Sequence, residues 1–267
     1  EKIGPEPPQE GGLGLDFDET VQAVEFRQLL DLLAGNPLAL QVVLPTLETD
    51  PPGKILRDLQ GGVEIKKKET RDRGSDIIAC IEYTHSNISP AAQELFLCLA
   101  SFRGAVNFGL IGDYFKDLGK FETFKDYPFH KMDEVVDELV KKGFIWEAVP
   151  GAPYKIMGMH PVFSYFLKNK LNRYTDPPLV RGLETVFLAY YNRIAKWLGD
   201  MLVSGEAEER KKGLFLVKFE YENLSFALEK QLSRQESILH PFNTVNRYLE
   251  MNNQQQERLG FLEMVSR

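Results

Sequence analysis

The 267-residue sequence predicts a mainly α-helical fold. Apolar residues recur at helical spacing over most of the chain, and Gly, Pro and Ser residues interrupt them where helices would end. Only the region 144–157 reads as two short extended runs joined by a turn. We therefore expect a helical protein that contains one β-hairpin.

Breaks in composition divide the chain into four segments. The start, EKIGPEPPQEGGLG, is rich in Pro and Gly, and later boundaries are marked by the charge run VEIKKKETRDR (63–73) and by Asp176-Pro177-Pro178. The expected segments are a flexible lead-in at 1–14, a small helical domain at 15–62, a second domain at 63–175 and a helical region at 176–267.

The small helical domain begins with a compact helical corner. A helix is expected over about 18–34, with Gly35 ending it in a positive-φ conformation. Asn36 can cap the next helix and Pro37 suits its first position, where the missing N–H costs nothing. The second helix is expected to end at Pro51-Pro52-Gly53. A third, shorter helix (53–60) is expected to end at Gly61-Gly62.

The second domain starts as helices and ends as a hairpin. Ser89-Pro90 starts a helix that buries Leu95 and Phe96, and a further helical stretch is expected near 108–118. Apolar residues spaced i, i+3, i+4, i+7, i+8 then predict a helix over 131–143 that ends at Gly143; they are Met132, Val135, Val136, Leu139 and Val140.

Two extended runs, 144–149 and 154–157, follow this helix, with Pro150-Gly151-Ala152-Pro153 as the turn between them. Helices followed by a hairpin are typical of a winged-helix domain. After Met159 the chain is helical again to about Asn172. Beyond Leu179 every pattern is helical, with breaks near Val203-Ser204-Gly205 and His240-Pro241, which predicts helical hairpins of the TPR kind.

Charge and cysteine content exclude some classes of function. The net charge of −7 argues against a general nucleic-acid binder and against a polybasic membrane anchor. No apolar run approaches the roughly 20 residues of a membrane span. Cys80 and Cys98 lie in apolar stretches, as buried, reduced cysteines do. We expect a cytoplasmic protein.

Three short motifs occur in order along the chain. Gly35-Asn36-Pro37-Leu38-Ala39-Leu40 resembles a Gly-x-Pro motif, Met159-His160-Pro161 resembles a Met-His-Asp motif, and the stretch 220–228 (EYENLSFAL) resembles the pattern E-x-x-N-L-x-x-A-L. Over about 15–230 the chain thereby resembles the regulatory half of STAND signalling ATPases, the class that includes NB-ARC and NACHT proteins of immunity and cell death.

The resemblance implies a nucleotide-dependent switch. Pro37 would lie against the adenine of bound ADP or ATP, and His160 would donate from its ring to a phosphate and hold the closed, ADP-bound state. The implied partners are an upstream nucleotide-binding domain of the same polypeptide, a protein ligand on the C-terminal helical region, and further copies of the full-length protein on activation. Pro161 stands where the family has Asp, so any contact made by that carboxylate is lost.

The sequence also lacks features that an enzyme of this class needs. It has no G-x-x-x-x-G-K-[ST] segment, so we expect no catalytic residues and no ATP hydrolysis by this chain alone. His85, His130 and His240 show no metal-ligand spacing, and no metal is expected.

Other interpretations remain open. The chain could be a winged-helix DNA-binding regulator whose recognition helix spans 131–142, although this helix is acidic and has no Arg. It could be a plain helical-repeat scaffold. Gly35-Asn36-Pro37 could be helix punctuation only, and His160 an ordinary capping residue. Trp146 and Trp197 are expected in the core, as are the Phe and Tyr clusters, in preference to a base-stacking platform.

Overall fold

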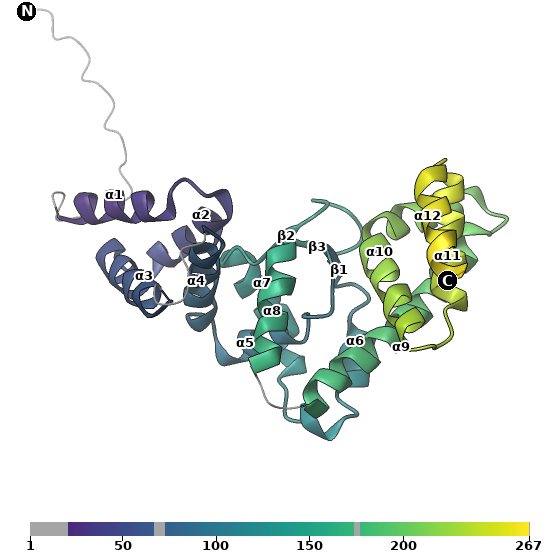
Figure 1. The fold of residues 1–267 in the computed structure, drawn as a ribbon, viewed down its shortest axis with the longest axis horizontal. Coiled ribbons are helices and arrows are strands. Elements are labelled where there is room, and N and C mark those ends of the chain that lie inside the picture. Colours follow the sequence, from purple (N-terminus) through teal and green to yellow (C-terminus); the bar gives the residue numbers. More distant parts are fainter. Residues whose placement is uncertain (1–20, 67–72, 174–176, 267) are drawn as a thin grey trace, which may run out of the picture. The chain divides into compact units, whose positions relative to one another are not determined.

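The computed structural model describes residues 21–66, 73–173 and 177–266, and within them the chain is mainly helical with one small antiparallel sheet (Figure 1). The mainly α-helical prediction is therefore confirmed; the predicted lead-in at 1–14 lies outside the described residues. The α-helices are Val21–Leu33 (α1), Pro37–Val43 (α2), Pro52–Lys66 (α3), Arg73–Ser86 (α4), Pro90–Leu97 (α5), Gly112–Leu118 (α6), Met132–Lys141 (α7), Pro161–Arg173 (α8), Pro177–Leu202 (α9), Ala207–Ser233 (α10), Leu239–Met251 (α11) and Gln255–Ser266 (α12). The strands are Ala105–Asn107 (β1), Ile145–Glu147 (β2) and Ile156–Met159 (β3), and the 3₁₀ helices are Leu44–Glu48 (η1), Glu122–Phe124 (η2) and Phe129–Lys131 (η3).

The chain divides into two compact units, the first ending at Ala79 and the second beginning at Cys80. This division falls inside α4. The predicted domain limits at 62 and 175 remain predictions. Cys80 and Cys98 are both buried, as expected.

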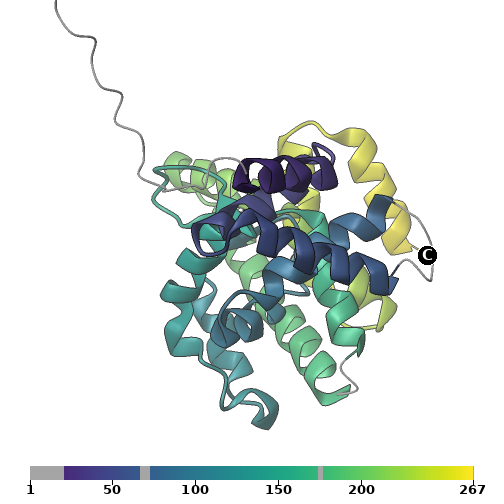
Figure 2. The same cartoon turned by 90° about the vertical axis from the view of Figure 1, so that its left-hand side faces the viewer.

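The first unit contains the predicted helical corner. Gly35 has a φ of +66°, and the Asn36 Oδ1 accepts from the backbone N–H groups of Leu38 and Ala39 at 3.0 and 3.1 Å. Pro37 then opens α2. Helix α1 packs against α3 (Figure 2), and their shared interior is apolar, formed by Leu29, Leu33, Ile55 and Leu59.

The predicted end of the third helix at Gly61-Gly62 is wrong. Helix α3 continues through both glycines to Lys66. A glycine in a helix costs about 1 kcal/mol relative to alanine, but it keeps its backbone N–H and C=O and so does not interrupt the hydrogen bonds. Residues 67–72 of the predicted charged boundary lie outside the described residues.

The sheet of the second unit has the strand order β1-β3-β2, with both pairings antiparallel. Strands β2 and β3 are the predicted hairpin. Strand β1 was not predicted, because three residues are too few to show an alternating pattern. The helical stretch expected near 108–118 begins only at Gly112, since Asn107 first closes a turn by accepting from the Gly109 N–H at 3.1 Å.

Helices α5 and α7 pack on each other beside the sheet. The predicted stripe of α7 points inward at Val135, Val136 and Leu139, whereas Val140 is 41% exposed. Glu138 ties α7 to the start of α5, because its two carboxylate oxygens accept from the backbone N–H and the hydroxyl of Ser89, both at 2.6 Å. The same hydroxyl accepts from the Ala92 N–H and so caps α5 as expected.

The C-terminal helices pack on one another. Helix α9 packs against both α10 and α11, and α11 packs against α12. The predicted break at 203–205 is confirmed. The second break comes slightly earlier than expected, so that Pro241 lies in the first turn of α11, and a third break at Asn252–Gln254 was not predicted.

Both tryptophans differ from the prediction that they lie in the core. Trp146 is 42% exposed and Trp197 is 38% exposed. The Trp146 indole covers Gly158 on the neighbouring strand, where an added Cβ would lie 2.4 Å from the ring. The buried aromatic residues are the Phe and Tyr clusters, as expected.

Candidate functional site

His160 lies at the junction between β3 and α8. Its backbone carbonyl accepts from the Phe163 N–H at 2.9 Å, and its ring Nδ1 accepts from the Val162 N–H at 3.2 Å. His160 is thus the N-terminal cap of α8, with Pro161 in the first helical position. The capping interpretation is confirmed, and the side chain is exposed.

This cap leaves the second ring nitrogen available. Because Nδ1 accepts a hydrogen bond, the proton of the ring is on Nε2, which becomes a donor. The donor is next to the start of a 13-residue helix, where backbone N–H groups and the helix dipole favour anions. The arrangement can therefore bind a phosphate oxygen or a carboxylate, and the predicted phosphate contact of His160 remains a prediction.

Pro37 is the other predicted nucleotide contact. Its ring is exposed at the first position of α2, and it offers an apolar surface without a donor. The two predicted nucleotide contacts lie in different units: Pro37 belongs to the first unit and His160 to the second.

The motif that begins at Glu220 has a role that the sequence did not reveal. Asn223 is completely buried, its Oδ1 accepts from the backbone N–H of Arg103 at 2.6 Å, and its Nδ2 donates to the carbonyl of Ala105 at 2.7 Å. One side chain on α10 thus forms hydrogen bonds with backbone groups on both sides of Gly104, the residue just before β1. The sequence signal was the presence of polar residues, Glu220 and Asn223, on a mainly apolar helix face.

Glu220 lies one turn before Asn223 and is also buried. Its carboxylate accepts from the Tyr191 hydroxyl at 2.8 Å, and Asn223 Nδ2 lies 3.4 Å away. Burial raises the pKa of Glu220 to about 7, against an ordinary value of 4.5, and the two hydrogen bonds offset only part of that effect. This carboxyl therefore titrates near neutral pH.

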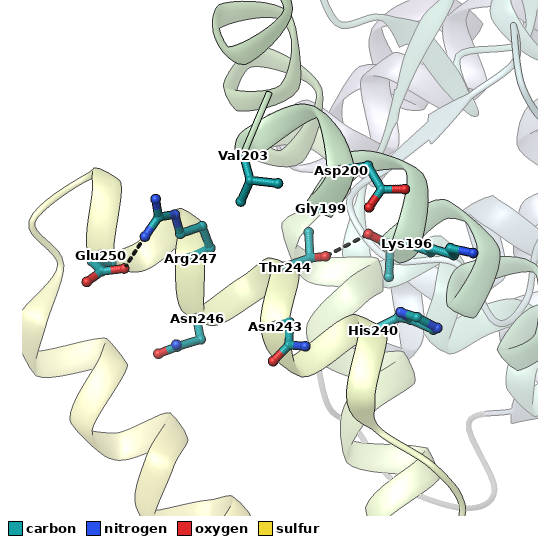
Figure 3. Close-up of a pocket in the computed structure, with 11 residues that line it drawn as sticks. Lys196, Gly199, Asp200, Val203, His240, Asn243, Thr244, Asn246, Arg247 and Glu250 are labelled. Carbon is teal, nitrogen blue, oxygen red and sulfur yellow. Dashed lines mark hydrogen bonds and ion pairs between the residues drawn. The ribbon is translucent and has the colours of Figure 1, made fainter. Parts of the chain in front are cut away.

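A groove of about 510 Å³ runs between α9 and α11 (Figure 3). The two helices approach closely because Gly199 has no side chain: a Cβ there would lie 2.7 Å from the Thr244 Oγ1. Thr244 in turn donates to the Ala195 carbonyl at 2.6 Å. The sequence analysis missed this groove because its two walls are separated by about 40 residues of chain.

Polar and charged side chains line most of the groove. Figure 3 shows Lys196 and Asp200 on the α9 side and Arg247 and Glu250 on the α11 side. Arg247 pairs with Glu250 at 3.1 Å. Mixed charge of this kind suits an extended peptide with both acidic and basic side chains.

The outward face of α7 bears on the DNA-binding alternative. Asp133, Glu134 and Asp137 are exposed, while Lys142 is buried. A helix that enters the major groove must approach phosphates, which repel carboxylates.

The remaining histidines lie apart. His85 is buried among Phe96, Phe144 and Phe166, and burial together with the nearby Lys170 ammonium lowers its pKa to about 3. His130 is exposed and His240 is half-buried in the groove. In the part of the chain that the structure describes, His, Cys, Asp and Glu side chains form no group of three or more that could hold a metal ion.

Within the same residues, no helix has the length and apolar character that crossing a membrane requires. Comparison with known proteins gives no further assignment: no protein family, curated protein or solved structure matches this chain.

Proposed function

We propose that this chain is a nucleotide-dependent regulatory and protein-interaction module of a STAND-type signalling ATPase. In this proposal it helps to hold a closed, ADP-bound state and links that state to a sensor region. The nucleotide site is completed by an upstream domain of the same polypeptide, and activation allows full-length copies to associate.

The order of elements in the second unit supports a winged-helix domain. We base this part of the proposal on the element order α5-β1-α6-α7-β2-β3 and on the strand order β1-β3-β2. The wing is the loop between β2 and β3, with Gly151 at a φ of +74°.

The proposal depends above all on His160. It follows β3 directly, caps α8 through Nδ1, and presents Nε2 as an exposed donor at a helix start. A histidine at this point can distinguish the nucleotide-bound state from the nucleotide-free state. It contacts phosphate only when nucleotide is bound, and it caps its helix in both states.

The C-terminal helices fit the sensor role. The groove between α9 and α11 offers a mixed-charge surface for a protein ligand, and Asn223 joins the same helical region to β1. A displacement of α10 would therefore be transmitted to the sheet that precedes His160. The acidic outer face of α7 favours this function over DNA binding.

Two variants of the intact protein separate the capping role of His160 from nucleotide contact. His160→Asn keeps a cap, because an Asn Oδ1 can accept from the same helix start, but it removes the Nε2 donor. We expect the purified His160→Asn protein to lose its bound ADP while its melting temperature stays within about 2 °C of the unchanged protein. ADP released by denaturation and measured by chromatography is the readout.

His130→Ala, which removes another exposed histidine of the same unit, is the control and should retain ADP. Retention of ADP by His160→Asn, or the lack of a P-loop in the gene upstream of this chain, would contradict the proposal.

A further inference from the structure

Three cations of the second unit converge on the ring of Phe226. The guanidinium carbon of Arg103 lies 4.4 Å from the ring centroid, the Lys168 Nζ 4.6 Å and the Lys230 Nζ 5.7 Å. They come from the loop before β1, from α8 and from α10 respectively. Cations attract an aromatic face but repel one another, so their convergence needs a further cause.

The chain builds this cluster with the buried motif of α10. Asn223 fixes the backbone of Arg103, and Phe226 and Lys230 lie one and two helical turns beyond Asn223 on the same side of α10. Lys168 is about 12 Å along α8 from His160, at 1.5 Å per residue. The cluster is therefore separate from the helix start at His160 and does not depend on the function proposed for it.

Negative charge nearby is insufficient to balance the cluster. Glu184 on α9 pairs with Lys230 at 3.1 Å and also with Arg234, so one carboxylate is shared by two cations. A second carboxylate, Glu222, lies beside Gly104, next to Arg103 in the chain. Arg234 also pairs with Glu236 at 3.8 Å, so four cations face three carboxylates among the residues that the structure describes.

Lys168 experiences this imbalance most strongly. It is half-buried, and none of the ion pairs found in the described ranges involves it. Burial and the charges of Arg103 and Lys230 lower its pKa to about 8, despite the opposite effect of Glu184. An anion beside Lys168 would remove this repulsion.

A cavity of about 210 Å³ lies beside the cluster. Lys168, Lys230 and the Phe226 ring line it, together with Ser101 and Asn172, which add a hydroxyl and an amide donor. The Glu184 carboxylate, which pairs with Lys230, lines it as well. Leu171 and Leu183 line another part of it. The volume equals that of about seven water molecules, enough for a phosphoryl group and a small organic part.

We propose that this cavity binds the phosphoryl group of a small phosphorylated molecule, held by Lys168 and Lys230, which line it, while Arg103 adds positive charge from beside the Phe226 ring. Arg forks and Lys ammonium groups are the side chains that bind phosphate oxygens, and the apolar part of the cavity accommodates the group to which the phosphate is attached. The ligand would connect α8 and α10 with the loop that leads into β1.

Calorimetric titration in a chloride buffer tests the proposal, with inorganic phosphate and pyrophosphate as probes. We expect saturable pyrophosphate binding, and weakening by about tenfold or more in Lys168→Met, which keeps the apolar stem but loses the charge. Lys212→Met, on α10, is the control, because its ammonium lies outside the cavity and 5.2 Å from the Tyr154 ring. Its affinity should stay within about twofold.

Glu184→Gln provides the reciprocal test. It releases Lys230 and Arg234 from their shared carboxylate and should strengthen pyrophosphate binding several-fold. Lys230→Met, at the other lysine that lines the cavity, replaces Lys168→Met if the latter does not fold. Absence of saturable binding to either probe, equal affinities of Lys168→Met and Lys212→Met, or weaker binding by Glu184→Gln would overturn the proposal. Tighter binding of phosphate than of pyrophosphate would assign the site to the free ion, and the reverse order to a phosphorylated molecule.

Discussion

The region around the sheet and the α9–α10 pair are held together by different chemistry. Beside the sheet, the rings of Phe96 and Phe163 lie 5.0 and 5.3 Å from that of Phe144, with no charged group among the three. Between α9 and α10, a buried carboxyl on Glu220 accepts from Tyr191, and the neighbouring Asn223 reaches the backbone of β1. Both interiors are closed to solvent.

This contrast separates stability from specificity. Apolar rings gain free energy wherever they are buried, and their contribution changes little with pH. A buried carboxyl or amide contributes only when its partners are in place, and therefore selects one register of the two helices. The polar interior should lose stability as the pH rises through 7, whereas the apolar one should lose stability only as the pH falls below 6.5, where the unfolded chain protonates His85.

Phe144→Ala should cause the largest loss of stability, and it should leave the difference in pH response between the two regions unchanged. Phe144 is completely buried, so the loss of its ring should lower the free energy of unfolding by about 3–5 kcal/mol. Denaturant unfolding at pH 7.5 and at pH 9, both above the range in which His85 beside Phe144 takes up a proton, should give the same loss. Val140→Ala, at an exposed position of α7, should change stability by less than about 0.5 kcal/mol. A loss that differs strongly between the two pH values would remove the distinction between the regions.

Glu220→Gln tests the polar interior directly. The pKa of Glu220 is about 7 in the folded protein against 4.5 when unfolded, so folding favours the protonated form. The contribution of this group is fully present below pH 4.5 and is lost as the pH rises through 7, a total of about 3 kcal/mol. Relative to the unchanged protein, Glu220→Gln should gain stability progressively between pH 5 and pH 8. Glu229→Gln, an exposed change on the same helix, should not; parallel curves for both variants would show that Glu220 does not titrate in this range.

Asn223→Ala should lower the free energy of unfolding by less than Phe144→Ala does, but its effect should reach from α10 to the sheet. It leaves the Arg103 N–H and the Ala105 C=O without their side-chain partner, at a cost of about 2 kcal/mol. Hydrogen exchange should accelerate at β1 more than at α7. Asn243→Ala on α11, where the side chain is exposed, is the control. Unchanged exchange at β1 would indicate that the sheet keeps its edge strand without α10.

The features that sequence predicted best are local. The corner at Gly35, Asn36 and Pro37 could be inferred because a positive φ, a cap and a first-turn proline each depend on neighbouring residues. The same holds for Ser89-Pro90 and for His160 as a cap. Helix α3 was misjudged at its glycines because packing against α1 outweighs their weak propensity.

The features that sequence missed depend on distant residues. Strand β1 is three residues long and is defined by its pairing with β3, about 50 residues away. The cation cluster needs Arg103, Lys168 and Lys230 in one place, and no periodic pattern joins them. Glu220 and Asn223 could have been noticed as polar residues on an apolar face, but their partners could not have been named.

The contacts of Asn223 with the chain around β1 can form only late in the synthesis of the protein. Ala105 and Asn223 are 118 residues apart, so a ribosome adding about 5–20 residues per second needs roughly 6 to 24 s to deliver the partner of β1. During that interval β1, which lies at an edge of the sheet, lacks its contact with α10 and is open to pairing with another chain. A nascent chain that stalls before α10 is therefore a natural substrate for chaperones, and an expressed piece that ends near 175 should be more prone to aggregate than one that includes α10.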